Sequence, residues 1–253
     1  MPGIDDWLAA LEQRYLANLT HSEVTRALRA LSSCYVERRG KLQSGAALDG
    51  EGKRAAFALY YGPLHFLTIT EIVRALGAHE TSIASIADLG CGTGVGGAAW
   101  ALACGGRPAI SGVDASGWAV DEANRTYSAL GVRGRARTGD LGRHVPSGRS
   151  ADTAVLLAYA VNELTDDSRA ALLERLTAPA RGKAPLLIVE SIARRDKPWW
   201  SAWAERLGAA GARVDEWRFP ASLPPLVEQL ARSAGLTHRE LTARTIATLD
   251  PAP

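Results

Sequence analysis

The sequence predicts an α/β protein in which a helical extension precedes a doubly wound, mostly parallel sheet. From Ser82 onward, short apolar runs alternate with amphipathic stretches, which is the pattern of successive βαβ units. Before Ser82, apolar residues recur at helical spacing. A chain of 253 residues is also near the upper limit for one hydrophobic core. We therefore divide it into a helical region, residues 1–80, and a sheet domain, residues 81–253.

The composition excludes several classes of protein. The chain has 29 Lys and Arg residues against 27 Asp and Glu residues, a formal net charge of +2, with 47% hydrophobic and 22% charged residues. This balance excludes a disordered chain, and so small a net charge does not indicate nucleic-acid binding over the whole surface. No stretch approaches the roughly 18 consecutive apolar residues of a membrane span, so we expect no membrane-spanning segment.

The cysteines and the N-terminus point to a reducing compartment. Cys34, Cys91 and Cys104 are odd in number and lack metal-ligand spacing, which predicts neither a disulfide framework nor a metal site. The chain begins with Asp5 and Asp6 and not with the basic and apolar segments of a secretory signal. We expect a cytoplasmic protein.

The helical region is predicted element by element. Apolar residues from Ile4 to Leu19 fall on one helical face, and Thr20 to Glu23 forms a capping box that opens a second helix. That helix should end near Arg39-Gly40, because glycine is favoured just past a helix end. Two more features complete the region: a glycine-rich linker over residues 40–52, and helices over residues 53–61 and 64–76 separated by Gly62-Pro63.

The strands and helices of the sheet domain are predicted from the same kinds of pattern. Strands are predicted at 83–89, 109–113, 135–138, 153–158 and 185–190, with helices at 95–103, 117–130 and 168–176. After Ser191 the pattern predicts helices at 199–207 and 225–234 and strands at 213–219 and 237–248. The sequence does not give the order of these two late strands.

One segment, Ile86 to Gly97, carries most of the functional information. An apolar strand runs into glycines at positions 90, 92 and 94 and then into a helix. Alternate glycines let the backbone turn sharply beside a ligand, and the helix start offers free N–H groups. Gly92, Gly94 and Gly97 also satisfy the dinucleotide pattern, which leaves a nicotinamide cofactor as an alternative. Asp88 favours the first register, because it places a carboxylate where a cationic amino group can sit.

The segment from Asp88 to Gly94 resembles motif I of class I S-adenosylmethionine-dependent methyltransferases. The resemblance implies a Rossmann-like fold and S-adenosylmethionine as cofactor, with the glycines beneath its methionine and ribose. Asp114, which ends the second strand, matches the residue that binds the ribose hydroxyls, and Asp140 matches the position facing the adenine amino group. The predicted cofactor-binding residues are Asp88, Gly90, Cys91, Gly92, Gly94, Asp114, Ala115, Asp140, Leu141 and Ala158.

The end of the fourth strand is where this family brings the target atom to the methyl group. The chain has no Asn/Asp-Pro-Pro-Tyr/Phe segment there and no cysteine nucleophile, which disfavours amino methylation of adenine or glutamine and carbon-5 methylation of pyrimidines. We predict in-line attack by an oxygen or nitrogen atom of the substrate. The candidate catalytic residues are Tyr159, Asn162 and Glu163, and the candidate substrate residues are Tyr61, His65 and Glu190.

A narrower resemblance covers residues 50–240 loosely. The runs Ala158 to Leu164 and Leu187 to Glu190 are similar to the mitochondrial small-ribosomal-subunit methyltransferase-like family and its bacterial relatives. The chain lacks that family's late cysteine-rich segment, and Ser191 follows Glu190 where the family has Pro-Gly. Two alternatives to an active methyltransferase remain: a catalytically idle ribosome-assembly factor and an NAD-dependent oxidoreductase.

Two basic clusters in the sequence indicate what kind of substrate or partner the protein binds. Residues 133–149 carry five arginines against Asp140 alone, a local charge of +4. A second basic cluster, Arg194, Arg195 and Lys197, precedes Trp199, Trp200 and Trp203. Such groups suit an anionic or single-stranded nucleic-acid substrate, although a solvated face and core tryptophans explain the same pattern. The predicted partners are a small-molecule or RNA substrate and a second copy of the chain, joined through the N-terminal helices, which also serve as lid or substrate selector.

Overall fold

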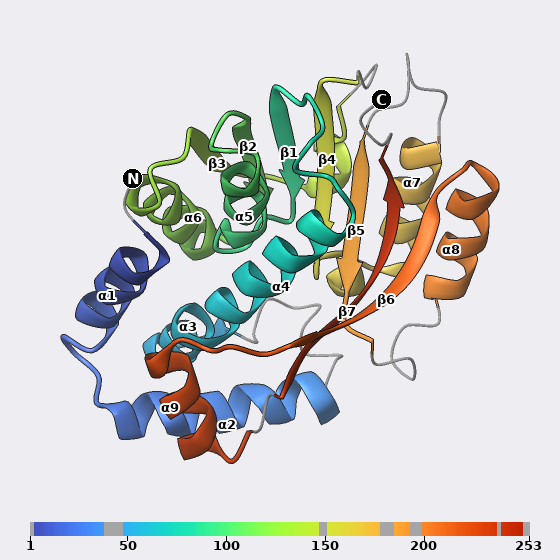
Figure 1. Ribbon diagram of the computed structural model, residues 1–253. Coiled ribbons are helices and arrows are strands. Elements are labelled where there is room, and N and C mark those ends of the chain that lie inside the picture. The colour runs from blue at the N-terminus through green and yellow to red at the C-terminus, as the bar shows by residue number, and fades with distance from the viewer. Residues whose placement is uncertain are drawn as a thin grey trace.

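The computed structural model describes residues 3–37, 48–146, 151–177, 185–192, 199–236 and 239–249, without the side chains of residues 34–37. Seven strands form one sheet in the order β3-β2-β1-β4-β5-β7-β6 (Figure 1). Their bounds are β1 Ser85–Leu89, β2 Ala109–Asp114, β3 Gly134–Thr138, β4 Thr153–Ala158, β5 Leu186–Glu190, β6 Arg213–Pro220 and β7 Glu240–Thr248. The first five strands are parallel. This confirms the predicted α/β class.

The sequence leaves open the order of the last two strands, and the structure gives it. β7 lies between β5 and β6 and is antiparallel to both. Its central residues are buried, from Ala243 to Ala247. The consequence for the site is that Arg244 of β7 lies opposite Glu190 of β5.

Helices cover the two faces of the sheet (Figure 1). On one face lie α4 (Gly62–Ala75), α5 (Val95–Ala103) and α6 (Gly117–Ala129), and on the other lie α7 (Asp166–Thr177) and α8 (Trp199–Ala209). Trp200 and Trp203 are buried in the second core cluster, which confirms the interpretation of these tryptophans as core residues. None of the described helices is long and apolar enough to cross a bilayer.

The N-terminal helices pack against the rest of the chain. They are α1 (Ile4–Tyr15), α2 (His21–Glu37) and α3 (Glu51–Ala56), and α2 contacts α9 (Pro225–Ala234). The predicted capping box is present: the Thr20 N–H donates to Glu23 Oε2 at 2.8 Å, and the Glu23 N–H donates to Thr20 Oγ1 at 3.3 Å. The buried carboxylate of Glu122 on α6 anchors α1, since it accepts hydrogen bonds from Arg14 and from the Tyr15 hydroxyl.

The predicted break at Gly62-Pro63 is wrong. A π-turn, Phe57–Tyr61, joins α3 to α4 without interruption, and the Gly62 N–H donates to the Phe57 carbonyl. Pro63 has no N–H to contribute to an α-helical ladder, so the wider turn accommodates it. A Cβ at position 62 would lie 3.7 Å from Thr93 Oγ1, an ordinary contact distance, so α4 begins close to the loop after β1.

Other differences are at boundaries. α1 ends at Tyr15, β1 begins at Ser85 and β7 begins at Glu240, each a few residues inside the predicted element. The 3₁₀ turns η4 (Leu141–His144) and η5 (Val161–Glu163) were not predicted. Several predicted features lie outside the described residues: the helix end at Arg39-Gly40, linker residues 40–47, Arg149, Arg194, Arg195 and Lys197.

Candidate active site

The glycine loop after β1 is tightly packed at its ends and open in its middle. Gly90, Gly92 and Gly94 have φ angles of 73°, 52° and 77°, a region that favours glycine. A Cβ on Gly90 would lie 2.4 Å from Ala160 Cβ, and one on Gly94 would lie 2.8 Å from the Tyr127 ring. A Cβ on Gly92 would meet nothing within 4 Å. The loop therefore presents its backbone to open space at Gly92.

Replacement of Gly90 by alanine should destabilise the protein and weaken cofactor binding. The clash with Ala160 adds to the strain of a positive φ, and we expect a loss of about 1–3 kcal/mol in the free energy of unfolding, measured by urea titration. Gly105→Ala is the matched control, because Gly105 has the same φ of 73° but no neighbour within 4 Å of a Cβ. Equal losses in both variants would show that the contact with Ala160 is unimportant.

Asp114 connects the end of β2 to this loop. Its Oδ2 accepts a hydrogen bond from the Gly92 N–H at 2.9 Å, and its Oδ1 accepts one from the Ser116 N–H at 2.8 Å. Ala115 beside it is exposed. A carboxylate offers about four acceptor positions, so two remain for the paired hydroxyls of a ribose.

Asp88 lies beneath the loop and faces α5. Its side chain is buried, and its Oδ2 accepts a hydrogen bond from the Gly97 N–H at 2.9 Å. Burial raises the pKa of Asp88 to about 7; the Gly97 N–H lowers it and the negative charge of Asp114 raises it. The contact seen is to the start of α5, and contact with a cationic amino group stays a prediction.

Asp140 and Leu141 begin the 3₁₀ turn after β3. Asp140 is exposed and caps this turn, with Oδ1 accepting from the Gly142 N–H at 2.8 Å. Its Oδ2 is 3.7 Å from Arg143 Nε. Leu141 Cδ2 would be 3.2 Å from a Cβ on Gly90, so the turn lies against the glycine loop. An adenine contact at Asp140 stays a prediction.

Tyr159 has an unusual conformation at the end of β4. Its φ is 59°, the only positive value for a non-glycine residue in the part of the chain that the structure describes. The ring stacks on His65 of α4 with centroids 3.9 Å apart and planes 16° apart. Burial raises the pKa of the Tyr159 hydroxyl, the charge of Glu190 raises it further and a hydrogen bond with Thr68 lowers it, so the phenol stays neutral. Strained backbone of this kind concentrates at functional sites.

Glu190 lies near Tyr159, and Glu163 lies near Glu190. Glu190, at the end of β5, is buried, and its Oε1 accepts a hydrogen bond from the Asn162 N–H at 3.3 Å. Glu163 in η5 is accessible to solvent. Partial desolvation raises the pKa of Glu163 to about 7, helped by the negative charges of Asp114 and Glu190. The structure thus brings Glu163, one of the predicted catalytic residues, near Asp114, the predicted ribose ligand.

Sequence reasoning missed several residues of this site. Arg244, opposite Glu190, is buried, and its guanidinium carbon lies 4.1 Å from the Trp200 ring centroid. Thr68 contacts the Tyr159 hydroxyl from α4. Phe57 extends the aromatic group around Tyr61 and His65, with ring centroids 5.9 and 6.2 Å from theirs. The one available signal was helical spacing, since Phe57, Tyr61, His65 and Thr68 recur every three or four residues.

The described residues contain no group of three or more His, Cys, Asp or Glu side chains suited to a metal ion. Cys91 and Cys104 are buried free thiols. Burial is the main cause that raises the pKa of Cys91, so it lies in the glycine loop as a neutral thiol.

Comparisons with known proteins agree with this geometry. Residues 86–180 match the family model of a methyltransferase domain. An O-methyltransferase family protein from Burkholderia thailandensis aligns with a TM-score of 0.58 and 16% identity over 94% of this chain and 76% of that one. Magnesium protoporphyrin IX methyltransferase from Synechocystis, with bound S-adenosylmethionine, aligns with a TM-score of 0.48 and 18% identity over 72% of this chain and 79% of that one. A search among curated proteins gave no match.

The sheet order is that of a doubly wound α/β fold, and the glycine loop lies at the carboxyl edge of the sheet, where proteins of this architecture bind ligands. Residues 86–180 therefore match a methyltransferase domain, within a chain whose fold is that of the O-methyltransferase family protein.

Proposed function

We propose that the protein transfers the methyl group of S-adenosylmethionine to an oxygen or nitrogen atom of a substrate held at the ends of β4 and β5, and that Glu163 accepts the substrate proton. The observation that carries this proposal is the placement of Glu163 beside Glu190 and Asp114, next to the strained Tyr159. These residues lie at the sheet edge where ligands of this architecture bind.

The residues of the loop fit the cofactor. Gly92 leaves open space above the backbone, and Asp114 retains acceptor positions beside it for ribose hydroxyls. Asp88 holds the start of α5 through the Gly97 N–H and so fixes the loop from below. The cofactor supplies an activated sulfonium methyl group, and S-adenosylhomocysteine is left after transfer. Orientation of the nucleophile can then supply a large part of catalysis, about 7–11 kcal/mol.

Four side chains are given roles toward the substrate. Glu163 is placed to take a proton, because a base with a pKa near the working pH is the most effective. Tyr159 presents a ring whose orientation is fixed by its stack on His65. Asn162 is positioned through its backbone N–H by Glu190 and can orient the acceptor with its amide. Tyr61 completes the aromatic side of the site near His65, with ring centroids 6.2 Å apart.

Two experiments test the proposal in sequence. Calorimetry should show micromolar binding of S-adenosylhomocysteine and none of NAD, and the reverse result would favour the oxidoreductase alternative. A radiolabelled methyl-transfer screen over RNA and metabolite pools should then give a labelled product. Cofactor binding without transfer to any pool, together with co-purification with ribosomal particles, would favour the catalytically idle assembly factor.

Glu163→Gln should lower kcat by about 10²–10⁴-fold, because the amide cannot accept the proton. A base must be ionised, so the rate of the unchanged protein should rise with pH through about 7, and that inflection should disappear in the variant. The control is Glu205→Gln, at an exposed position of α8, which should behave as the unchanged protein. An unchanged pH profile in Glu163→Gln would remove Glu163 as the base.

The proposal includes an rRNA acceptor and a cytoplasmic location, both of which are supported by the sequence alone. A homodimer through the N-terminal helices would use the polar faces of α1 and α2, because Trp7, Leu8 and Leu11 are already buried within the chain. The division at residue 80 into a substrate-selecting region and a cofactor domain is likewise proposed, supported by the contribution of His65 and Thr68 from α4.

A further inference from the structure

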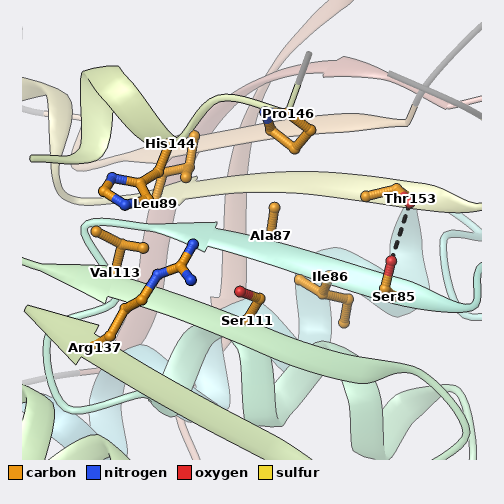
Figure 2. A pocket seen from close by; sticks show the side chains of 10 residues that line it. All are labelled: Ser85, Ile86, Ala87, Leu89, Ser111, Val113, Arg137, His144, Pro146 and Thr153. Carbon is orange, nitrogen blue, oxygen red and sulfur yellow. Dashed lines mark hydrogen bonds between the residues drawn. The ribbon is translucent and has the colours of Figure 1, made fainter. Parts of the chain in front are cut away.

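A groove lies on the face of the sheet opposite Asp88 and α5. The described part of the β3–β4 connection contains the 3₁₀ turn η4 and no α-helix. The described helices of this face, α7 and α8, pack over β4, β5 and β7. Between η4 and the exposed surfaces of β1, β2 and β3 there is a hollow of about 260 Å³ (Figure 2). Its size suits a small polar group better than a large apolar ligand.

The lining of this groove is polar and positively charged. Hydroxyl groups come from Ser85, Ser111 and Thr153, of which Ser85 and Thr153 pair with each other at 3.0 Å. Arg137 reaches from β3 across the face toward β1, on the same side as the Ser111 hydroxyl and the His144 ring (Figure 2). The described residues that line the groove are Ser85, Ile86, Ala87, Leu89, Ser111, Val113, Arg137, His144, Pro146 and Thr153, and none of these is acidic.

The groups that could bind an anion are available. Arg137 and Ser111 are both paired through their backbones in the sheet, but among the described residues neither side chain has a hydrogen-bonding or ionic partner. His144 is held at the rim by Nδ1, which lies 2.7 Å from the Asp140 carbonyl oxygen. Arg135 is exposed and pairs in register with Ser111, two residues from Arg137 on the same face of β3. Alternate residues of a strand are about 6.6 Å apart, so the two guanidinium groups form a short positive row.

We propose that this groove binds a phosphate ester. Arginine suits phosphate because its planar guanidinium donates two parallel hydrogen bonds, and serine hydroxyls complete the coordination of the remaining oxygens. In a concave site, charges of one sign are less screened than on an open surface. A carboxylate ligand would meet the same charges, but it has fewer oxygens for the separated hydroxyls. The ester can belong to a free nucleotide or to a nucleic-acid strand, and Arg135 distinguishes the two because it lies beyond the lining of the groove.

The proposed site is separate from the cofactor site. Leu89 and Val113 line its floor and directly precede the Gly90 loop and Asp114, on the opposite side of the sheet from α5. A ligand in the groove would therefore contact the strand residues that carry the cofactor loop without occupying the loop itself. The proposal does not depend on methyl transfer, and it can hold if the proposed substrate chemistry is wrong.

The test uses the full chain saturated with S-adenosylhomocysteine, so that the cofactor site is filled. Two probes, uridine 5′-phosphate and a single-stranded oligouridylate, are titrated by calorimetry and by fluorescence anisotropy. Arg137→Gln should weaken binding of whichever of the two probes binds by at least about tenfold, and Ser111→Ala should weaken it by less. Arg232→Gln on α9 is the matched control, since it removes an exposed arginine that pairs with Glu228, and it should change nothing.

A free nucleotide and a nucleic-acid strand give different results in this test. If Arg135→Gln weakens the oligonucleotide and not the mononucleotide, and lowers the slope of log K against log salt by about 0.7, the groove holds a nucleic-acid strand. If both probes bind equally and Arg135 has no effect, a free phosphate ester is the ligand. The proposal is overturned if neither probe shows binding that depends on Arg137, if Arg232→Gln weakens binding as much, or if phosphatidylserine vesicles compete equally. Unchanged S-adenosylhomocysteine affinity in Arg137→Gln separates these outcomes from loss of the fold or of the cofactor site.

Discussion

Asp114→Ala should weaken the binding of S-adenosylhomocysteine by about ten- to a hundredfold. The carboxylate is expected to accept hydrogen bonds from ribose hydroxyls, and bonds to a charged group contribute about 1.5–3 kcal/mol. The same substitution removes the bond to the Gly92 N–H, which fixes the middle of the glycine loop. Both losses affect the bound state, so the effect should be visible by calorimetry at a temperature where the variant is folded.

A matched control separates position from charge. Asp121 is exposed on α6, and Asp121→Ala removes the same charge from a residue seven positions away. This control should bind S-adenosylhomocysteine as the unchanged protein does. If Asp114→Ala and Asp121→Ala bind equally well, Asp114 does not contact the cofactor, and the match to the ribose-binding position is wrong.

Asp88→Asn should flatten the dependence of stability on pH. The pKa of Asp88 is about 7 in the folded protein against an ordinary value of 3.8, so between these values the folded state holds a proton that the unfolded state has lost. The stability contributed by this proton is complete below pH 3.8 and is lost as the pH rises through about 7. At about 1.4 kcal/mol per pH unit, the difference amounts to about 4 kcal/mol.

Asparagine is neutral at every pH and can still accept the hydrogen bond from the Gly97 N–H. The free energy of unfolding, measured by denaturant titration from pH 5 to pH 8, should therefore fall less for Asp88→Asn than for the unchanged protein. Glu163 also has a raised pKa and changes stability in the same direction, so Glu163→Gln is measured in parallel. Parallel curves for the unchanged protein and Asp88→Asn would show that Asp88 stays ionised in the fold.

Local patterns predicted the part of the site formed by consecutive residues. The loop from Asp88 to Gly94 and the residue that ends β2 each follow directly from one strand, and parallel strands bring their carboxyl ends to one edge. The position of Arg244 could not be predicted in this way, because it depends on β7 entering between β5 and β6. The stack of His65 on Tyr159 joins residues from α4 and the end of β4, which no local spacing connects.

The π-turn shows the same limit within one element. Glycine and proline side by side are a reasonable signal for a break, yet the missing N–H of Pro63 is accommodated by a wider helical turn that keeps the helix continuous. A signal for a break in a regular α-helix is therefore also compatible with a π-turn, and the two residues do not distinguish these outcomes.

The antiparallel insertion of β7 also determines when the active site can be completed during synthesis. Until residues 240–248 have left the ribosome, β5 is an edge strand with unpaired backbone groups, and Glu190 lacks the arginine that lies opposite it in the finished sheet. The glycine loop is made about 150 residues earlier. A nascent or C-terminally shortened chain would therefore contain every residue of the cofactor loop and still lack a finished acceptor side.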